Sequence, residues 1–364
     1  MIGTTPLRRG WTTGACATAA AKAAFTALLT GTFPDPVEIA LPRGQRVAFT
    51  LAETQLLPGA AIAGVVKDAG DDPDVTHGAL VFARVTPGPP GTGVQFRAGP
   101  GIGTVTRPGL PIPPGEPAIN PTPRAMIRVA LAEVAPDPDV VVELSIPGGE
   151  VLAAQTLNGR LGIVGGLSIL GTTGIVVPYS CAAWIDTIHR GVDVARAIGL
   201  THVAASTGSV SEAAVRALHG LPDTALLEMG DFAGATLKYL RRHPVPRVTI
   251  AGGVAKMTKL AQGRMDLHSR AGAADLPALG ALVADPALAA RIAAAQTVAE
   301  AFLAARDAGA ALGDIVAAAA RRSAIAVLDQ ADVALDVVLF DRSGNLVGRD
   351  GPDHAPAPGL NRRS

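Results

Sequence analysis

The sequence has little of several features that would place it in a familiar class of protein. Its two cysteines, Cys16 and Cys181, form no CxxC pair, so neither a disulfide scaffold nor a structural zinc site is expected. Basic and acidic residues balance at 31 each. A general nucleic-acid binder needs a basic excess to neutralise phosphates, and this sequence has none.

Long hydrophobic runs are also missing. An uncharged stretch extends from Leu161 to Ile185, but several glycines and a proline interrupt it, whereas a spanning helix needs about 20 consecutive apolar residues. The N-terminus, MIGTTPLRRGW, reaches two arginines with no apolar segment behind them, which argues against a secretory signal. We therefore expect a cytoplasmic protein that uses neither membrane nor nucleic acid as a partner.

Glycine and proline are abundant instead, with 42 and 29 residues. That content alone would suggest disorder, because both residues interrupt regular structure. The apolar fraction of 48% and the mean hydropathy of +0.33 outweigh it, since a chain of 364 residues can then bury a sizeable core. The length predicts two domains.

Residues 1–157 are expected to form an α+β domain with a mixed sheet. An alanine-rich helix over Ala15–Leu29 should have Thr12 or Thr13 as its N-cap. A second helix is expected over Pro121–Val134, because prolines are tolerated in a first turn. Apolar alternation predicts strands, the first two as a hairpin, at Val37–Leu41, Arg46–Leu51, Ala61–Val66, Ala79–Val85, Gly93–Arg97 and Val140–Ile146.

From about Leu161, strands, glycine-rich turns and helices alternate, which predicts an α/β domain with a mostly parallel sheet over residues 158–348. Strands are expected at Leu161–Val164, His202–Ala205, Ala225–Glu228, Val248–Ala251 and Val333–Phe340. Helices are expected at Tyr179–Ile198, Ser211–Leu218, Phe232–Arg241 and Leu276–Arg306. Ligands of such sheets bind outside the carboxyl ends of the strands. Residues 349–364 are expected to form a disordered tail.

The glycine-rich run GIVGGLSILGTTGIV, residues 162–176, directly follows the first of those expected strands. Glycines let backbone N–H groups approach a ligand, and threonine hydroxyls can donate to it. The run matches neither GxGxxG nor GxxxxGK[ST]. The alternative is that these glycines only permit tight packing. The candidate ligand-contacting residues are Gly165, Gly166, Ser168, Gly171, Thr172 and Thr173.

Two carboxylates follow the expected strand Ala225–Glu228, in the sequence EMGD. Glu228 and Asp231 lie where a carboxylate can hold a ribose hydroxyl, although Asp231 could instead cap the next helix. The preceding segment STGSVSE, residues 206–212, could bind a carboxylate. The spacing of Ser209 and Glu212 slightly favours a capping box.

The segment GDDPDVTHG, residues 70–78, gathers acidic side chains around His77. Calcium-loop spacing is absent, and an Asp-rich turn around Pro73 is the main alternative to a role in binding or proton transfer. His77 is the best titratable candidate near neutral pH. In GPGIGTVTRPGL, residues 99–110, Arg107 offers a fork-shaped donor, or the segment is a plain hairpin. For both cysteines, a small buried residue is favoured over a nucleophile.

Taken in order, these segments resemble the cobalt-precorrin-5B C(1)-methyltransferase family of the anaerobic cobalamin pathway. The resemblance extends from Leu7 to about Asp275 and is carried by LRRGWTTGACATAAAKAA, GDDPDVTHG, GPGIGTVTRPGL, GEPAINPTPRAMI, GRLGIVGGLSILGTTGIVVP, EMGDF and LHSRAG. The sequence departs from the family pattern at Trp11, where Tyr is expected, at Ala15, where a hydroxyl residue is common, and at Tyr179, where Met is usual.

The resemblance implies methyl transfer from S-adenosylmethionine to C1 of a cobalt-containing corrinoid, giving cobalt-precorrin-6A. Cobalt would arrive with the substrate, so no protein-bound metal is expected. The substrate's carboxylates suit Arg8, Arg9, Arg107 and Arg124. We hypothesise that the first domain covers the macrocycle, with Thr12 and Thr13 as further candidate substrate contacts. Methyl transfer to carbon is largely a positioning problem.

On this hypothesis the glycine-rich run and Glu228/Asp231 hold the cofactor in the second domain, and Asp72 or His77 receives any proton released. A non-catalytic tetrapyrrole or nucleotide carrier that uses the same cleft is the alternative function. An unrelated α/β transferase or dehydrogenase is disfavoured, because the dinucleotide fingerprint is missing. The sequence leaves a homo-oligomer open.

Overall fold

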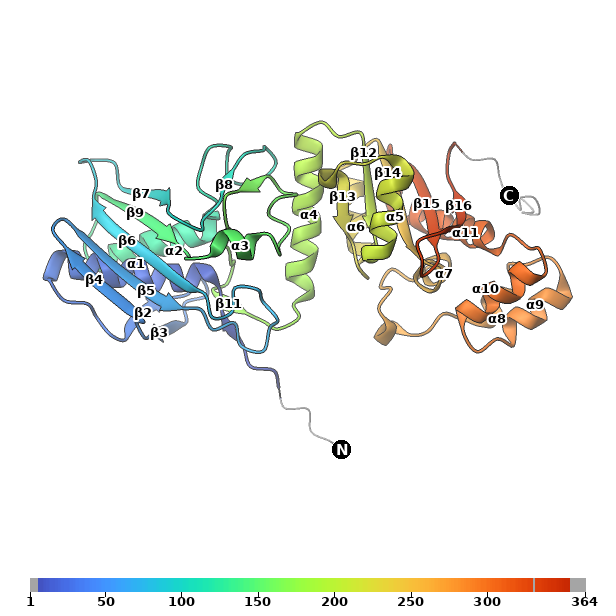
Figure 1. The fold of residues 1–364 in the computed structure, drawn as a ribbon, viewed down its shortest axis with the longest axis horizontal. Helices are drawn as coiled ribbons and strands as arrows, with labels where there is room; N and C mark the ends of the chain where they lie inside the picture. Colours follow the sequence, from blue (N-terminus) through green and yellow to red (C-terminus); the bar gives the residue numbers. More distant parts are fainter. Residues whose placement is uncertain (1–5, 330, 354–364) are drawn as a thin grey trace. The chain divides into compact units, whose positions relative to one another are not determined.

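The computed structural model describes residues 6–329 and 331–353. The chain divides into two compact units between Cys181 and Ala182, and each has its own elements (Figure 1). The boundary expected at residues 157/158 differs from this division. Residues 158–181, including the glycine-rich run, belong to the first unit.

A helix that is buried on nearly every side forms the centre of the first unit. This helix, α1 (Thr13–Thr30), begins at the N-cap Thr12 and ends at Gly31, whose left-handed φ of 79° suits glycine. Its alanines are almost fully buried. Because alanine side chains are short, the sheet and helix α2 can approach α1 closely, and a helix that is apolar all round belongs inside a core.

The sheet that packs on α1 is mixed, with strand order β4-β5-β6-β9-β7. Its strands are β4 (Glu53–Leu57), β5 (Ala60–Val66), β6 (Leu80–Pro87), β9 (Val140–Ser145) and β7 (Val94–Ala98). Neighbouring strands are antiparallel except β7 and β9, which are parallel. The expected hairpin is β2 (Val37–Ala40) with β3 (Arg46–Phe49), and the second helix is α2 (Pro121–Ala132).

The glycine-rich segments of this unit form short antiparallel pairs rather than a parallel sheet. β1 (Gly10–Trp11) pairs with β11 (Ile175–Val176), and β8 (Thr104–Val105) pairs with β10 (Ile163–Val164). A short helix, α3 (Gly149–Ala153), follows β9. The prediction that Leu161–Val164 opens the parallel sheet is therefore wrong. A short apolar run does not reveal its partner, and here the partner lies earlier in the chain.

The second unit contains a five-stranded sheet with order β13-β12-β14-β15-β16. Its strands are β12 (His202–Ser206), β13 (Leu226–Glu228), β14 (Arg247–Gly253), β15 (Ala334–Phe340) and β16 (Leu346–Asp350). All neighbours are parallel except the last pair. Strand order reverses at β12, whose neighbours β13 and β14 both follow it in the chain. Such a reversal creates a crevice at the carboxyl ends of the strands.

Helices cover both faces of that sheet. The helices of this unit are α4 (Cys181–Ala197), α5 (Ser209–His219), α6 (Ala233–Arg242), α7 (Val254–Ala261), α8 (Leu276–Gly280), α9 (Pro286–Ala293), α10 (Val298–Asp307) and α11 (Leu312–Leu328). The single long helix expected over Leu276–Arg306 is thus three helices. Asp285 and Thr297 start new helices by capping them with their side chains.

The prediction of a tail over residues 349–364 is wrong at its start. Arg349 and Asp350 belong to β16, where Arg349 pairs with Val338 and Asp350 with Val337. Residues 351–353 are also described, and Asp353 pairs with Arg247 at 2.7 Å, whereas residues 354–364 lie outside the described residues. A mixed α/β architecture with sheets of both orientations agrees with the fold class expected from the sequence.

Candidate functional site

The segments that stand out in the sequence of the first unit meet around the start of α1. The Arg8 backbone is hydrogen-bonded to Asp71, and the Trp11 N–H donates to the Asp68 carbonyl at 2.7 Å. On the other side, the Thr12 N–H donates to the Gly174 carbonyl at 3.0 Å. The N-terminal segment is therefore held between the acidic loop 70–78 and the glycine-rich run 162–176.

Thr12 and Thr13 are both buried and already engaged inside the protein. The Thr12 hydroxyl accepts from the Ala15 N–H at 3.2 Å as the N-cap of α1, which confirms one of the two expected caps. The Thr13 hydroxyl exchanges hydrogen bonds with the backbone of Leu170 at 3.2 Å. These two side chains fix the glycine-rich run against the helix start.

Three of the six candidates in the glycine-rich run have a packing explanation. A Cβ added to Gly171, where φ is 128°, would lie 2.5 Å from the Thr12 Cβ. A Cβ on Gly166 would lie 2.7 Å from the Ile102 nitrogen. Ser168 is buried, with its hydroxyl 3.4 Å from the Asn158 side-chain oxygen. Here the tight-packing alternative accounts for the residue type.

The other three candidates in the run lie nearer the surface. Gly165 is exposed, has a φ of 88°, and nothing lies within 4 Å of where its Cβ would be. Thr172 is also exposed. The Thr173 hydroxyl is hydrogen-bonded to the backbone of Ile175, so it stabilises the turn locally.

A buried lysine organises the acidic loop. The Lys67 side chain is 3% exposed, and its ammonium donates to the Asp74 carboxylate and the Thr76 hydroxyl. Burial alone raises the pKa of Asp74, but the Lys67 charge and the hydrogen bonds from Lys67 and Thr76 outweigh it, and the net pKa is lowered. Sequence reasoning missed Lys67, because one lysine at the end of a strand carries no recognisable pattern.

The two candidate proton-transfer residues, Asp72 and His77, lie on this loop with different hydrogen bonding. One Asp72 oxygen accepts from the Tyr179 N–H at 2.8 Å. The His77 Nδ1 accepts from the Ala69 N–H at 3.1 Å, which assigns the proton of the neutral ring to Nε2. In that tautomer His77 is a hydrogen-bond donor toward the exterior, whereas the carboxylate of Asp72 can accept.

An exposed ion pair lies beside them. The Arg8 guanidinium binds the Asp68 carboxylate in a two-pronged pair, one arm of which measures 2.9 Å. The hydrogen bond from Arg8, followed by one from the Gly70 N–H, lowers the pKa of Asp68 to about 2. Asp68 therefore stays ionised near neutral pH and faces His77, whose Nδ1 lies 3.9 Å away.

The two candidate arginines are partly committed to the protein. The Arg124 guanidinium donates to the Ile119 and Pro117 carbonyls and pairs with Glu116 at 3.1 Å. The stem of Arg107 packs where Gly162 lacks a side chain, and its guanidinium reaches the Arg160 carbonyl only at 3.5 Å. Of the two, Arg107 retains more donor capacity for a ligand.

Cys16 lies in α1 and is fully buried. Burial raises the pKa of its thiol to about 12 even though Lys67 is nearby. A protonated, buried thiol is a packing residue, as the sequence favoured. Cys181 is exposed. Within residues 6–329 and 331–353, no three His, Cys, Asp or Glu side chains gather as a metal site would require.

A separate site is framed at the carboxyl edge of the second sheet. The loops after β12 and β13 are joined by the Lys256 ammonium, which donates to the Thr207 carbonyl at 2.9 Å and lies 3.0 Å from an Asp231 oxygen. Glu228 ends β13 with its side chain exposed. The N-cap of α5 is Gly208, so the capping box expected from Ser209 is not formed.

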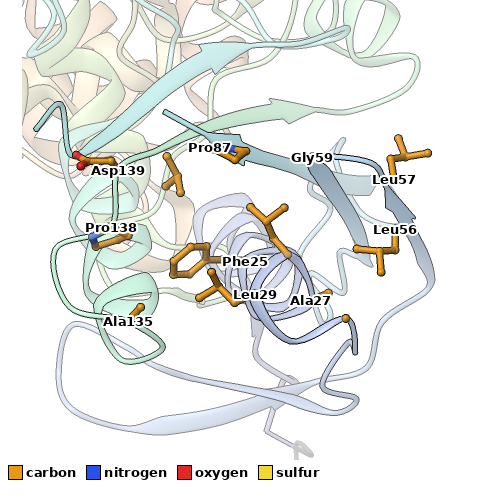
Figure 2. A pocket seen from close by; sticks show the side chains of 13 residues that line it. Phe25, Ala27, Leu29, Leu56, Leu57, Gly59, Pro87, Ala135, Pro138 and Asp139 are labelled. Atoms are coloured by element: carbon orange, nitrogen blue, oxygen red, sulfur yellow. The ribbon is translucent and has the colours of Figure 1, made fainter. Parts of the chain in front are cut away.

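An apolar groove of about 630 Å³ lies elsewhere in the first unit, at the other end of α1 (Figure 2). Its lining includes Phe25, Leu29, Leu56 and Asp139. The Asp139 carboxylate already accepts the Gly91 and Gly93 N–H groups. Because α1 spans 18 residues, or about 27 Å, this groove is remote from the loops at the helix start.

Comparison with known proteins relates both units to one family. The chain matches the CbiD family over residues 2–178 and the CbiD C-terminal domain over residues 266–351. It is 61% identical to the cobalt-precorrin-5B C(1)-methyltransferase of Bradyrhizobium sp., covering 98% of this chain and 97% of that protein. The counterpart from Halorhodospira halophila is 62% identical over 95% of each chain. The chain belongs to this family.

A crystal structure titled cobalamin biosynthesis protein (cbiD) from Archaeoglobus fulgidus is 25% identical, covering 84% of this chain and 85% of that one, with a TM-score of 0.39.

Among the residues that the structure describes, no helix combines the length and apolar character needed to cross a membrane. The family match confirms the resemblance read from the sequence motifs.

The glycine-rich run does not lie in the domain where the sequence predicted it. It was expected in the second domain beside Glu228 and Asp231, but it belongs to the first unit, whereas the two carboxylates belong to the second. The placement is wrong because the run includes β10, which pairs with β8 of the first unit rather than with the parallel sheet.

Proposed function

We propose that this chain transfers the methyl group of S-adenosylmethionine to C1 of cobalt-precorrin-5B, giving cobalt-precorrin-6A and S-adenosylhomocysteine in cobalamin biosynthesis. The observation that carries this proposal is identity above 60% over nearly the whole length of relatives that bear this activity in their names. The motifs of both units take part in that match, so the proposal applies to the whole chain.

The carboxyl edge of the second sheet fits the methyl donor. Glu228 offers a carboxylate at a strand end, and Asp231, Lys256 and the backbone of Thr207 bring the neighbouring loops together. This is where open α/β sheets bind nucleosides. Bound here, S-adenosylmethionine would supply an electrophilic methyl group on its sulfonium sulfur.

We assign the macrocycle to the first unit. Acetate and propionate side chains of a corrinoid need cationic and N–H donors, and Arg107 is the least committed of the candidate arginines. Arg124, Thr12 and Thr13 support the loops that would contact the substrate, since their donors are bonded within the protein. Gly165 and Thr172 are the exposed members of the glycine-rich run that remain candidates for ligand contact.

Charge balance requires a proton acceptor. Transfer of a methyl cation to a neutral ring carbon leaves one positive charge on the product, which the loss of a proton removes. Asp72 has one carboxylate oxygen bonded to the Tyr179 N–H and another able to accept. His77, protonated at Nε2, would donate to a substrate carboxylate or carbonyl. We therefore place proton acceptance at Asp72.

The test is anaerobic incubation of the chain with cobalt-precorrin-5B and methyl-labelled S-adenosylmethionine. Label in the corrinoid product supports the proposal. A carrier, the alternative function, binds the corrinoid without transferring label. An Asp72→Asn variant should lose turnover by 10²-fold or more while corrinoid affinity stays within about threefold. If Asp72→Asn turns over normally, Asp72 is not the acceptor.

Two further expectations remain predictions: division of labour between a substrate-facing first unit and a cofactor-binding second unit, and a cytoplasmic location.

A further inference from the structure

Trp184 is an exposed aromatic side chain at the carboxyl edge of the second sheet. Aromatic residues make up only 3% of the chain, and two are tryptophans, yet Trp184 leaves 45% of its surface exposed. A large apolar ring in water forgoes the stabilisation that burial would give. Single exposed apolar residues are common on proteins, so the argument depends on what surrounds this ring.

The surroundings hold the ring in one orientation. The Trp184 Nε1–H donates to the Glu228 carbonyl at 2.9 Å. One side of the ring faces Gly230, where an added Cβ would lie 3.5 Å from the indole. Phe232 lies at the edge, with ring centroids 6.4 Å apart and planes tilted by 48°. The indole is thus fixed by the loop after β13 while much of its surface stays open.

The residue whose backbone carbonyl receives the indole hydrogen bond, Glu228, also carries an exposed carboxylate. Within the described part of the chain, the Glu228 side chain has no hydrogen-bond or ion-pair partner, although its backbone carbonyl receives the Trp184 bond. Asp231, the second candidate, is paired with Lys256 at 3.0 Å. Of the two carboxylates, that of Glu228 is therefore the one without an ion-pair partner, and we take it as the acceptor for hydroxyls from a ligand.

The topology independently supports a nucleoside at this point. β12 lies at the reversal of strand order, and Glu228 ends the adjacent strand, with Ser206 and Glu228 directly paired across β12 and β13. Glu228 follows Gly208, in the loop after β12, by 20 residues. In doubly wound sheets an acid at about this spacing from the phosphate-binding glycines accepts the ribose hydroxyl.

We propose that Trp184 and Glu228 form an adenosine subsite, in which the purine stacks on the indole and the ribose hydroxyls donate to the Glu228 carboxylate. This assignment adds Trp184 to the cofactor site and separates the roles of Glu228 and Asp231. It depends on the proposed function only for the choice of ligand, S-adenosylmethionine rather than another adenosine compound.

The first experiment measures S-adenosylhomocysteine binding to the full chain by calorimetry. Trp184→Ala should weaken affinity about 10- to 100-fold, the range that loss of one base–aromatic stack gives, whereas Trp184→Phe should weaken it about threefold or less. Leu303→Ala is the matched control, because Leu303 is a similarly exposed apolar residue, on α10 of the same unit. Unchanged affinity in a folded Trp184→Ala variant overturns the proposal.

The second experiment tests the ribose contact by competition. Adenosine should displace S-adenosylhomocysteine better than 2′,3′-dideoxyadenosine in the wild-type chain, and Glu228→Gln should reduce this preference at least threefold. Asp231→Asn should keep the preference, because the Asp231 charge is already paired with Lys256. If Asp231→Asn removes the preference and Glu228→Gln retains it, the assignment of the two carboxylates is wrong.

The third experiment separates failure of the subsite from failure of the proposed function. In Trp11→Phe, Trp184 is the remaining tryptophan, so saturating adenosine should change its emission. Unchanged emission in the bound complex overturns the subsite even if labelled methyl transfer succeeds. Conversely, absence of methyl transfer in a chain whose Trp184 responds to adenosine overturns the enzymatic function and leaves the subsite standing.

Discussion

At the scale of single residues, the glycines of this chain fall into two kinds that the sequence cannot separate. Some occur where another part of the chain comes too close for a side chain, as at Gly171 beside Thr12. Others have a left-handed backbone with open space around them, as at Gly165. Glycines of the first kind are required because no space is left for a side chain. Those of the second kind are favoured only because a positive φ strains other residues.

Gly171 and Gly165 provide a matched comparison. Gly171→Ala should lower the free energy of unfolding by about 3 kcal/mol, because it adds a clash with Thr12 to backbone strain. Gly165→Ala should lower it by about 1 kcal/mol, the cost of left-handed φ alone. Urea unfolding followed by circular dichroism measures both. Equal losses would show that the close approach at Thr12 contributes nothing.

The Arg8–Asp68 pair predicts a pH dependence at the same scale. The pKa of Asp68 is lowered to about 2 in the folded chain from about 3.9 when unfolded. The pair therefore stabilises the fold above about pH 4, and this contribution disappears as pH falls from 4 toward 2. Asp68→Asn should flatten the stability curve over that interval, and Arg8→Gln should flatten it too, in urea unfolding at stepped pH. If the stability of either variant falls between pH 4 and pH 2 as steeply as that of the wild type, the Arg8–Asp68 pair is not the source of this pH dependence.

At the scale of elements, the acidic loop 70–78 depends on one buried cation. Lys67 precedes the loop and binds Asp74 and Thr76 within it, while Asp72 and His77 occupy the same loop. The two candidate proton-transfer side chains thus lie on a loop that a buried residue, Lys67, holds in place. The side-chain chemistry of Asp72 and His77 alone would not indicate that Lys67 holds their loop in place.

Lys67→Met should destabilise the chain by about 3 kcal/mol, because it leaves the Asp74 charge without its partner. The double variant Lys67→Met/Asp74→Asn should recover part of this loss, since removing both members of a pair is less costly than removing one. Thermal and urea unfolding of the four chains completes the cycle. Strict additivity of the two single changes would show that the ion pair carries no coupling energy.

At the scale of the whole molecule, each unit has its own core and its own tryptophan. Trp11 packs on Phe49 in the first unit, and Trp184 lies in the second. The Trp184→Phe variant keeps Trp11, so its fluorescence reports the unfolding of the first unit. The Trp11→Phe variant keeps Trp184 and reports the unfolding of the second unit. Two cores of different composition need not share one transition.

S-adenosylhomocysteine at about 100 times its dissociation constant should stabilise the reporting unit by about 2.7 kcal/mol. We expect this shift in Trp11→Phe, whose remaining tryptophan reports the second unit. The shift should be smaller in Trp184→Phe, which reports the first unit and lacks the Trp184 indole proposed to bind the adenosine. Urea unfolding by fluorescence measures both midpoints. A larger shift in the first unit would place the cofactor there.

The sequence alone determined the local elements and the family. Alanine density and Thr12 determined α1, apolar patterning and the succession of strands, turns and helices determined most strands of both sheets but not β4 or β16, and the ordered motifs identified the relatives. These signals are local in the chain, so no knowledge of tertiary contacts is needed to detect them.

Only the tertiary structure decided which of these elements meet. It placed the glycine-rich run against the start of α1, assigned Lys67 to the acidic loop, and brought Trp184 beside Glu228. Each of these contacts joins residues whose pairing depends on the path of the chain between them. A short strand or a single lysine has many suitable partners, and packing and hydrogen bonding of the folded chain select one of them.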